Sequence, residues 1–171
     1  MALSKRRIIR DGLVAGLIGA GSVALWFLVI DLLAGRAFFT PAVLGSAVFW
    51  ALRDPAEVIV SLQPVLAYTA VHVLAFAIVG AAASFMIAEV ERDPGVVWLL
   101  IELFVVFEIG FYGAVALAFT PLLAELAWIN VAVGNLIAAG VMGMYFWRTR
   151  SALRALGAGD PTATPATRSA P

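Results

Sequence analysis

Four long apolar runs dominate the pattern of hydrophobic and polar positions along the chain. They cover residues 13–34, 65–88, 96–119 and 122–147, and polar or proline-containing segments separate them. Each run reaches the roughly 20 residues that an α-helix needs to cross about 30 Å of hydrocarbon. The pattern therefore predicts an all-α membrane protein with four transmembrane helices in an antiparallel up-down bundle.

Composition supports this class. Of the 171 residues, 63% are hydrophobic and 13% are charged, whereas a soluble domain is about 45–50% apolar and about 25% charged. A chain this short cannot bury such an excess in a water-soluble core. The formal net charge is zero and cysteine is absent, so we expect the lipid bilayer, and not nucleic acid, as a partner.

The basic residues predict the orientation. The chain has 11 lysines and arginines; only Arg36 and Arg53 fall on the side away from the N-terminus, which leaves nine on the N-terminal side. By the positive-inside rule both termini are expected in the cytoplasm. The first apolar run exceeds the roughly 7–15 residues of a signal-peptide core, which predicts an uncleaved first span. Arginine far outnumbers lysine and alanine is abundant, as in bacterial GC-rich genomes, so we expect the bacterial inner membrane.

The loops differ in character. The outer loop at 35–64 is long and apolar, and a short interfacial helix is predicted near 41–52. Asp54 and Glu57 have the spacing of a capping box, and Pro64 is expected to kink the chain before the second span. The predicted segments are a basic N-terminus (1–11), helix one (12–34), the outer loop (35–64), helix two (65–89), a cytoplasmic turn (90–95), helix three (96–119), an outer turn (120–121), helix four (122–147) and a disordered cytoplasmic tail (148–171).

Small residues recur every four positions on the predicted spans. Such spacing allows two helix backbones to approach closely in lipid. It predicts close packing inside one bundle or, as an alternative, a dimerisation face on the first helix. The positions are Gly12, Gly16, Ala20 and Ala24 on the first helix, and Gly80, Ser84 and Ala88 on the second.

Polar residues inside membrane spans are rare and mark candidate functional sites. From their positions in each run we expect two layers. In the outer layer Asp31 and His72 form a pair, with Tyr68 as an alternative partner of the histidine; in the central layer Glu108 of the third helix meets Asn135 of the fourth. Glu102 completes the set and lies nearer the cytoplasm.

Helical geometry separates the two glutamates. They are six residues apart, so their side chains point about 120° from one another and cannot form one dyad. Glu102 shares its stripe with Ile109 and Gly113, and we expect it to pack against its own bundle. Glu108 is either a neutral, hydrogen-bonded group that fixes helix register or a group that carries a proton or binds a cation.

Several familiar chemistries have no candidate residues. There is a single histidine, no Glu-x-x-His pair for a di-iron bundle, no nucleophile elbow and no glycine-rich phosphate loop. We therefore predict no catalytic residue, no metal site and no enzymatic activity; the sequence leaves any cofactor unknown.

Three segments carry a resemblance: WFLVIDLLAGRAFFTPAVLG at 26–45, FEIGFYG at 107–113 and GNLIAAGVMGMYFW at 134–147. Together they resemble a type of bacterial four-helix inner-membrane protein that has no assigned activity. The resemblance implies a placement in the membrane and brings no functional residues with it.

Three functions are therefore considered. The first is a non-catalytic small or accessory subunit of a larger membrane assembly, associated with other membrane proteins or with itself. The second is a small proton- or cation-coupled carrier that uses the intramembrane carboxylates. The third is a binder of an apolar cofactor or lipid.

Overall fold

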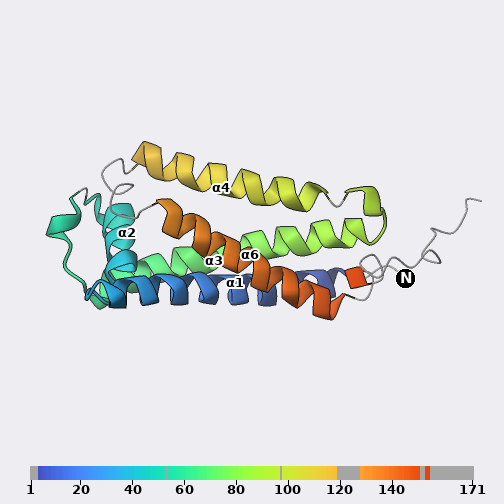
Figure 1. Cartoon of the computed structure of the whole chain (residues 1–171), viewed down its shortest axis with the longest axis horizontal. Helices are drawn as coiled ribbons and strands as arrows, with labels where there is room; N and C mark the ends of the chain where they lie inside the picture. The colour runs from blue at the N-terminus through green and yellow to red at the C-terminus, as the bar shows by residue number, and fades with distance from the viewer. Residues whose placement is uncertain (1–3, 53, 97, 119–127, 151–152, 155–171) are drawn as a thin grey trace, which may run out of the picture.

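The computed structural model describes residues 4–52, 54–96, 98–118, 128–150 and 153–154. Within this part of the chain the elements are helical (Figure 1). Three of them, α1, α3 and α6, are long and apolar enough to span a membrane. The elements are α1 (Lys5–Leu33), α2 (Phe39–Trp50), α3 (Leu62–Val90), α4 (Trp98–Ala118) and α6 (Trp128–Thr149), with short 3₁₀ turns η1 (Pro55–Glu57) and η2 (Pro94–Val96).

The glycines of α1 and α3 bring these two helices into very close contact. A Cβ atom added at Gly12 would lie 2.7 Å from Cα of Ala81, and one added at Gly16 or Gly80 would collide with the backbone of the opposite helix. Ser84 Oγ, farther along α3, donates to the Ile8 carbonyl oxygen at 2.8 Å. The intramolecular interpretation of the small-residue spacing is confirmed, and this face of α1 is not open to a second copy.

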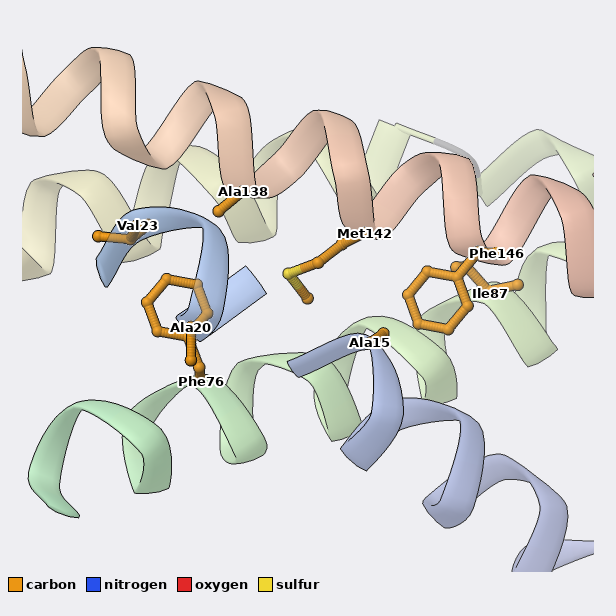
Figure 2. Packing of buried hydrophobic residues seen from close by; sticks show 8 residues of the cluster. All are labelled: Ala15, Ala20, Val23, Phe76, Ile87, Ala138, Met142 and Phe146. Atoms are coloured by element: carbon orange, nitrogen blue, oxygen red, sulfur yellow. The ribbon is translucent and has the colours of Figure 1, made fainter. Parts of the chain in front are cut away.

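Helix α6 lies against the α1–α3 pair, and the main apolar core is found where the three helices meet (Figure 2). Met142 points into this core, and its side chain occupies the space that a Cβ at Gly19 would need. On the same interface Trp26 Nε1 donates to the Asn130 carbonyl oxygen at 2.9 Å. The buried core residues are Ala15, Ala20, Val23, Phe76, Ile87, Ala138, Met142 and Phe146.

The predicted loop helix is present as α2, but it is packed against its own chain along much of its length. A side chain at Gly45 would collide with the carbonyl of Pro64 on α3. The chain enters and leaves α2 through two left-handed residues, Phe38 (φ 62°) and Ala51 (φ 53°). Pro64 lies in the first turn of α3, where its missing N–H costs no intrahelical bond, so the predicted kink is wrong.

The other described boundaries follow the apolar runs within a few residues, and the predicted start of the fourth helix at 122 lies outside the described residues. Helix α1 begins earlier than predicted, because Ser4 Oγ accepts a hydrogen bond from Arg7 N–H as an N-cap. Asp54 accepts from Ala56 N–H at 2.9 Å, but only the short turn η1 follows. The predicted outer turn at 120–121 lies outside the described residues, and so does the predicted tail apart from 148–150 and 153–154.

Helix α4 is the peripheral element. Figure 1 shows it on the far side of α3 and α6 from α1. Its contacts with these neighbours are made by large side chains: the rings of Phe107 and Phe76 lie 6.1 Å apart, and Tyr112 Oη donates to the Trp128 carbonyl oxygen at 2.7 Å. Its backbone therefore stands off from a bundle in which α1 and α3 touch directly.

The close contact of α1 and α3 can be tested with two alanine substitutions on one helix. Gly16→Ala should lower stability by about 1–3 kcal/mol, because the new methyl group meets the Phe76 backbone. Gly21→Ala meets nothing within 4 Å and should be neutral or raise stability by up to about 1 kcal/mol through helix propensity. Thermal unfolding in mild detergent measures both, and equal melting temperatures for the two variants would contradict the packing.

Candidate functional site

Asp31 does not pair with His72, which corrects the predicted outer layer. Its carboxylate reaches the first turn of α2, where Oδ2 accepts from Thr40 N–H at 2.8 Å and Oδ1 accepts from Thr40 Oγ1 at 2.7 Å. Only 3% of Asp31 is exposed. Phe38, at the N-cap position of α2, offers no capping side chain. Asp31 of α1 takes this role: it accepts a hydrogen bond from a free N–H group of the first turn, and its negative charge faces the positive end of the α2 dipole.

His72 is held by the backbone of α1. Its Nε2 lies 3.1 Å from the Ala20 carbonyl oxygen, and since a carbonyl can only accept, Nε2 acts as the donor in this bond. The ring lies between Tyr68 and Phe76, with centroid distances of 5.7 and 4.8 Å. This bond ties the middle of α3 to α1, which is a structural role.

The central layer forms as predicted. The side chain of Asn135 on α6 lies close to the carboxyl group of Glu108 on α4. Asn135 is 8% exposed. The second oxygen, Glu108 Oε1, is buried and has no hydrogen-bond partner among the described residues. One carboxyl oxygen of Glu108 is therefore covered by the protein without a hydrogen bond to the described residues.

Glu102 faces away from the bundle, which makes the expectation that it packs against its own chain wrong. It is exposed on α4, together with Ile109, Gly110 and Gly113. Side chains added at either glycine would meet nothing within 4 Å. The two glutamates do have different surroundings, as their angular separation requires, but Glu108 is the one directed at the bundle.

A buried cluster of charges at the N-terminal end of α1 was missed by the sequence analysis. Arg150, which the pattern assigned to a cytoplasmic tail, is 1% exposed and Asp11 is 2% exposed. Arg150 Nη2 donates to Ser84 Oγ at 2.9 Å and lies 3.4 Å from Asp11 Oδ2, while Nη1 lies 3.5 Å from Glu91 Oε2. We call these four residues the Arg150 cluster.

The Arg150 cluster joins three helices at one end of the molecule. Asp11 comes from α1, Ser84 from α3, Glu91 follows the end of α3, and Arg150 follows the end of α6. Arg10 Nη2 adds a second ion pair to Asp11 at 3.2 Å. The sequence signal was an acidic residue directly after Arg10 within the basic N-terminus, and its partner Arg150 lies far along the chain.

A cavity of about 180 Å³ lies between α4 and the surface formed by α3 and α6. We call it the α4 cavity. Asn135 is the one polar side chain in its wall, and its aromatic residues come from all three helices. Its lining residues are Phe76, Val79, Ala83, Ile87, Leu100, Leu103, Phe104, Phe107, Asn135, Ala138, Ala139, Met142, Gly143 and Phe146.

The chemistry available in the described part of the chain is narrow. No group of three or more histidine, cysteine, aspartate or glutamate side chains is close enough there to hold a metal ion. Asp31, His72 and the Arg150 cluster are committed to contacts between helices. The α4 cavity, with Asn135 in its wall, remains as the arrangement suited to binding.

Comparison with known proteins adds no constraint. No protein-family model matches the chain, and no curated protein or solved structure matches it either.

The Arg150 cluster predicts a large effect of a single substitution. Arg150→Met removes the cation shared by the buried Asp11 and the half-buried Glu91 and leaves Asp11 only its ion pairs to the exposed Arg7 and Arg10, so it should cost about 1–3 kcal/mol. Arg148→Met removes an exposed arginine two residues away and should change stability by about 0.5 kcal/mol or less. Thermal unfolding in detergent compares the two; similar losses would show that burial of Arg150 does not matter.

The bond from Asp31 to α2 predicts a local effect. Asp31→Ala removes the acceptor of two hydrogen bonds to Thr40 and should destabilise the first turn of α2 by about 1–2 kcal/mol. Hydrogen exchange of the α2 amides should accelerate roughly tenfold, while exchange in α6 stays unchanged. Faster exchange throughout the protein would instead indicate a global role for Asp31.

Proposed function

We propose that the protein is a multi-pass, four-span protein of the bacterial inner membrane, with both termini in the cytoplasm, that serves as a non-catalytic accessory subunit of a larger membrane assembly. Helices α1, α3 and α6 are the three long apolar spans. Helix α4 has 21 residues, which corresponds to about 31 Å at about 1.5 Å per residue. We assign it as the fourth span, in an up-down antiparallel bundle with α2 at the outer interface.

The placement of charges supports this topology. Asp11 near the start of α1 and Arg150 after the end of α6 are in contact, so the beginning of the first span and the end of the last one lie at the same end of the molecule. The exposed basic residues Arg7, Arg10 and Arg148 are found there as well. An even number of spans and a basic end agree with two cytoplasmic termini.

The observation that carries the proposed function is the outward face of α4. Glu102, Ile109, Gly110 and Gly113 are exposed on it, and 66% of Ile109 is exposed. Exposed apolar residues are expected on every span in lipid, and exposed glycines also occur on α1 and α6, at Gly21, Gly140 and Gly143. The feature that distinguishes the α4 face is the exposed carboxylate of Glu102 in line with two of its glycines. Small residues lose packing contacts when they face acyl chains, whereas they permit close approach of another helix.

Glu102 indicates that the partner helix carries a basic residue. It forms no ion pair with another residue in the described ranges, and it lies one turn into α4, near the cytoplasmic boundary of the proposed span. An acidic residue at the centre of a span costs about 2.5–3.5 kcal/mol on insertion scales, and less toward the boundary. A partner helix with a basic residue at that boundary would offset the cost.

The carrier alternative has less support. It relied on Glu108 and Asn135 together with Glu102 and an Asp31–His72 pair. Asp31 instead bonds to Thr40, and His72 bonds to the Ala20 carbonyl. Glu102 points away from the bundle. Only the Glu108–Asn135 contact remains for that function.

Two matched glycine substitutions test the assembly. Gly113 on α4 and Gly140 on α6 are both exposed, and a Cβ at either meets nothing within 4 Å. When the protein is extracted from its own membrane with mild detergent, it should comigrate with other membrane proteins in a native-mass separation. Gly113→Leu should abolish this comigration because it blocks the α4 face, and Gly140→Leu should leave it intact.

A second substitution addresses the charge. Glu102→Gln keeps the shape of the side chain and should weaken comigration about tenfold if a basic partner residue is present. A monomeric wild-type protein at native expression level would refute the assembly function.

A further inference from the structure

We propose that the α4 cavity holds one acyl chain of a phospholipid from the cytoplasmic leaflet, with the chain end at the middle of the bundle and the head group at the cytoplasmic boundary. This inference rests on the proposed placement of α4 as the fourth span. It is independent of any partner protein, because the cavity faces inward from α4 whereas the docking face points outward. It is carried by the position of the cavity along the spans, the apolar nature of its wall and its opening to the side.

The cavity occupies one half of the bundle. On each of three helices its wall begins near the middle of the helix and finishes close to one end: it runs from Phe76 to Ile87 on α3, from Phe107 to Leu100 on α4 and from Asn135 to Phe146 on α6. On α3 and α6 the distance is eleven residues, which corresponds to about 16 Å. Half of a hydrocarbon core of about 30 Å is about 15 Å. The cavity therefore has the length and the depth of the acyl chains of one leaflet.

The end at which the wall finishes is the proposed cytoplasmic end. Arg150 Nη1, after the end of α6, lies 3.5 Å from Glu91 Oε2, after the end of α3, so these helices end on the same side of the molecule. Arg148 is exposed there, and so are Trp98 at the start of α4 and Trp147 on α6. Tryptophans at helix ends lie at the head-group level of a bilayer, and an arginine beside them can pair with a lipid phosphate. A phospholipid head group fits this boundary.

The wall selects hydrocarbon as the occupant. Within the described part of the chain, Asn135 is the one lining residue with a polar side chain, whereas a buried water molecule needs about two to four polar partners. An empty space would deprive the wall of packing contacts. The volume of about 180 Å³ compares with roughly 150 Å³ for an engineered apolar cavity that takes up the six carbons of benzene. In proportion, the α4 cavity encloses about seven carbons of a chain.

The shape of the cavity suits a flexible chain better than a compact ring. The lining side chains from α4 are leucine and phenylalanine, whereas four of those from α3 and α6 are alanine or glycine, namely Ala83, Ala138, Ala139 and Gly143. Large side chains on one side and small ones on the other leave a groove along the helices. A ring would fill only part of this length, and a chain can follow it.

The cavity opens sideways between α4 and α6, which gives a chain its route of entry. At the end of the bundle opposite the Arg150 cluster, Tyr112 Oη of α4 donates to the Trp128 carbonyl oxygen of α6 at 2.7 Å. From there α4 and α6 diverge toward the end where the N-terminus lies (Figure 1). Ala139 and Gly143 line the cavity and are also exposed. A chain whose head group stays at the membrane surface can therefore enter between the two helices.

Native mass spectrometry tests the inference on the full-length protein, extracted from its own membrane in mild detergent and washed free of loosely held lipid. The wild type should retain one phospholipid per chain. A Cβ at Gly143 meets nothing within 4 Å, so Gly143→Leu should fill the cavity and lower the lipid-bound fraction about tenfold. Gly140→Leu, exposed on the same helix and outside the wall, should retain the lipid as the wild type does.

Thermal unfolding shows whether the chain fills a space in the fold. Complete removal of lipid should lower the melting temperature of the wild type and of Gly140→Leu by about 5–10 °C, because the cavity is then empty. Dioleoylphosphatidylethanolamine added back should restore it. Gly143→Leu fills the space with its own side chain, so its melting temperature should change little on removal of lipid. A cooperative melting transition also shows that this variant is folded.

Three results would contradict the inference. Retention of lipid by Gly143→Leu at the wild-type level would exclude the α4 cavity as the site, and so would a wild-type melting temperature that does not respond to removal of lipid. A retained compound with a mass other than that of a phospholipid, lost in Gly143→Leu, would exclude the acyl chain as the occupant.

The assembly function is judged separately by Gly113→Leu, on the outer face of α4. This variant should lose comigration with other membrane proteins but keep the phospholipid. A wild type that carries the phospholipid and migrates alone would contradict the assembly function only. A wild type that comigrates with other proteins and carries no phospholipid would contradict the acyl-chain site only.

Discussion

The close approach of α1 and α3 is the constraint on which the rest of the structure depends. Gly12, Gly16 and Gly80 leave no room for a Cβ atom, so the two backbones meet directly. In lipid there is little hydrophobic gain from pairing helices, and dense packing of this kind supplies the attraction. The α1–α3 pair then forms the surface on which α6 packs, with Met142 against the glycine at position 19.

Most of the buried polar groups complete this packing by joining one helix to another. Asp31 of α1 bonds to the first turn of α2, His72 of α3 bonds to the α1 backbone, and Arg150 bonds to α1 and α3 residues. In a low-dielectric interior a polar group with a partner costs much less than one without, and each such contact also fixes the rotation of its helix. Asp31 and His72, which the sequence marks as candidate functional residues, therefore hold helices of the fold together.

Helix α4 has the opposite character, and both proposals originate from it. It stands off from α3 and α6, and large side chains such as Phe107 and Tyr112 make its contacts. The distance leaves the cavity on its inner side, and the glycines Gly110 and Gly113 remain uncovered on its outer side. A helix with few contacts to its own chain leaves its outer face open to a neighbouring helix.

The sequence alone determined the helical class, the apolar spans and the spacing of small residues, because these depend on length and local periodicity. It also required Glu102 and Glu108 to have different surroundings, since the angle between them is set within one helix. Which glutamate faces inward was decided only by the rotation of α4 against α3 and α6. The contact between Asp11 and Arg150 was likewise beyond local pattern, because residues at opposite ends of the chain meet only when three helices have packed. Local periodicity therefore fixes which residues share a face, whereas helix packing decides what each face meets.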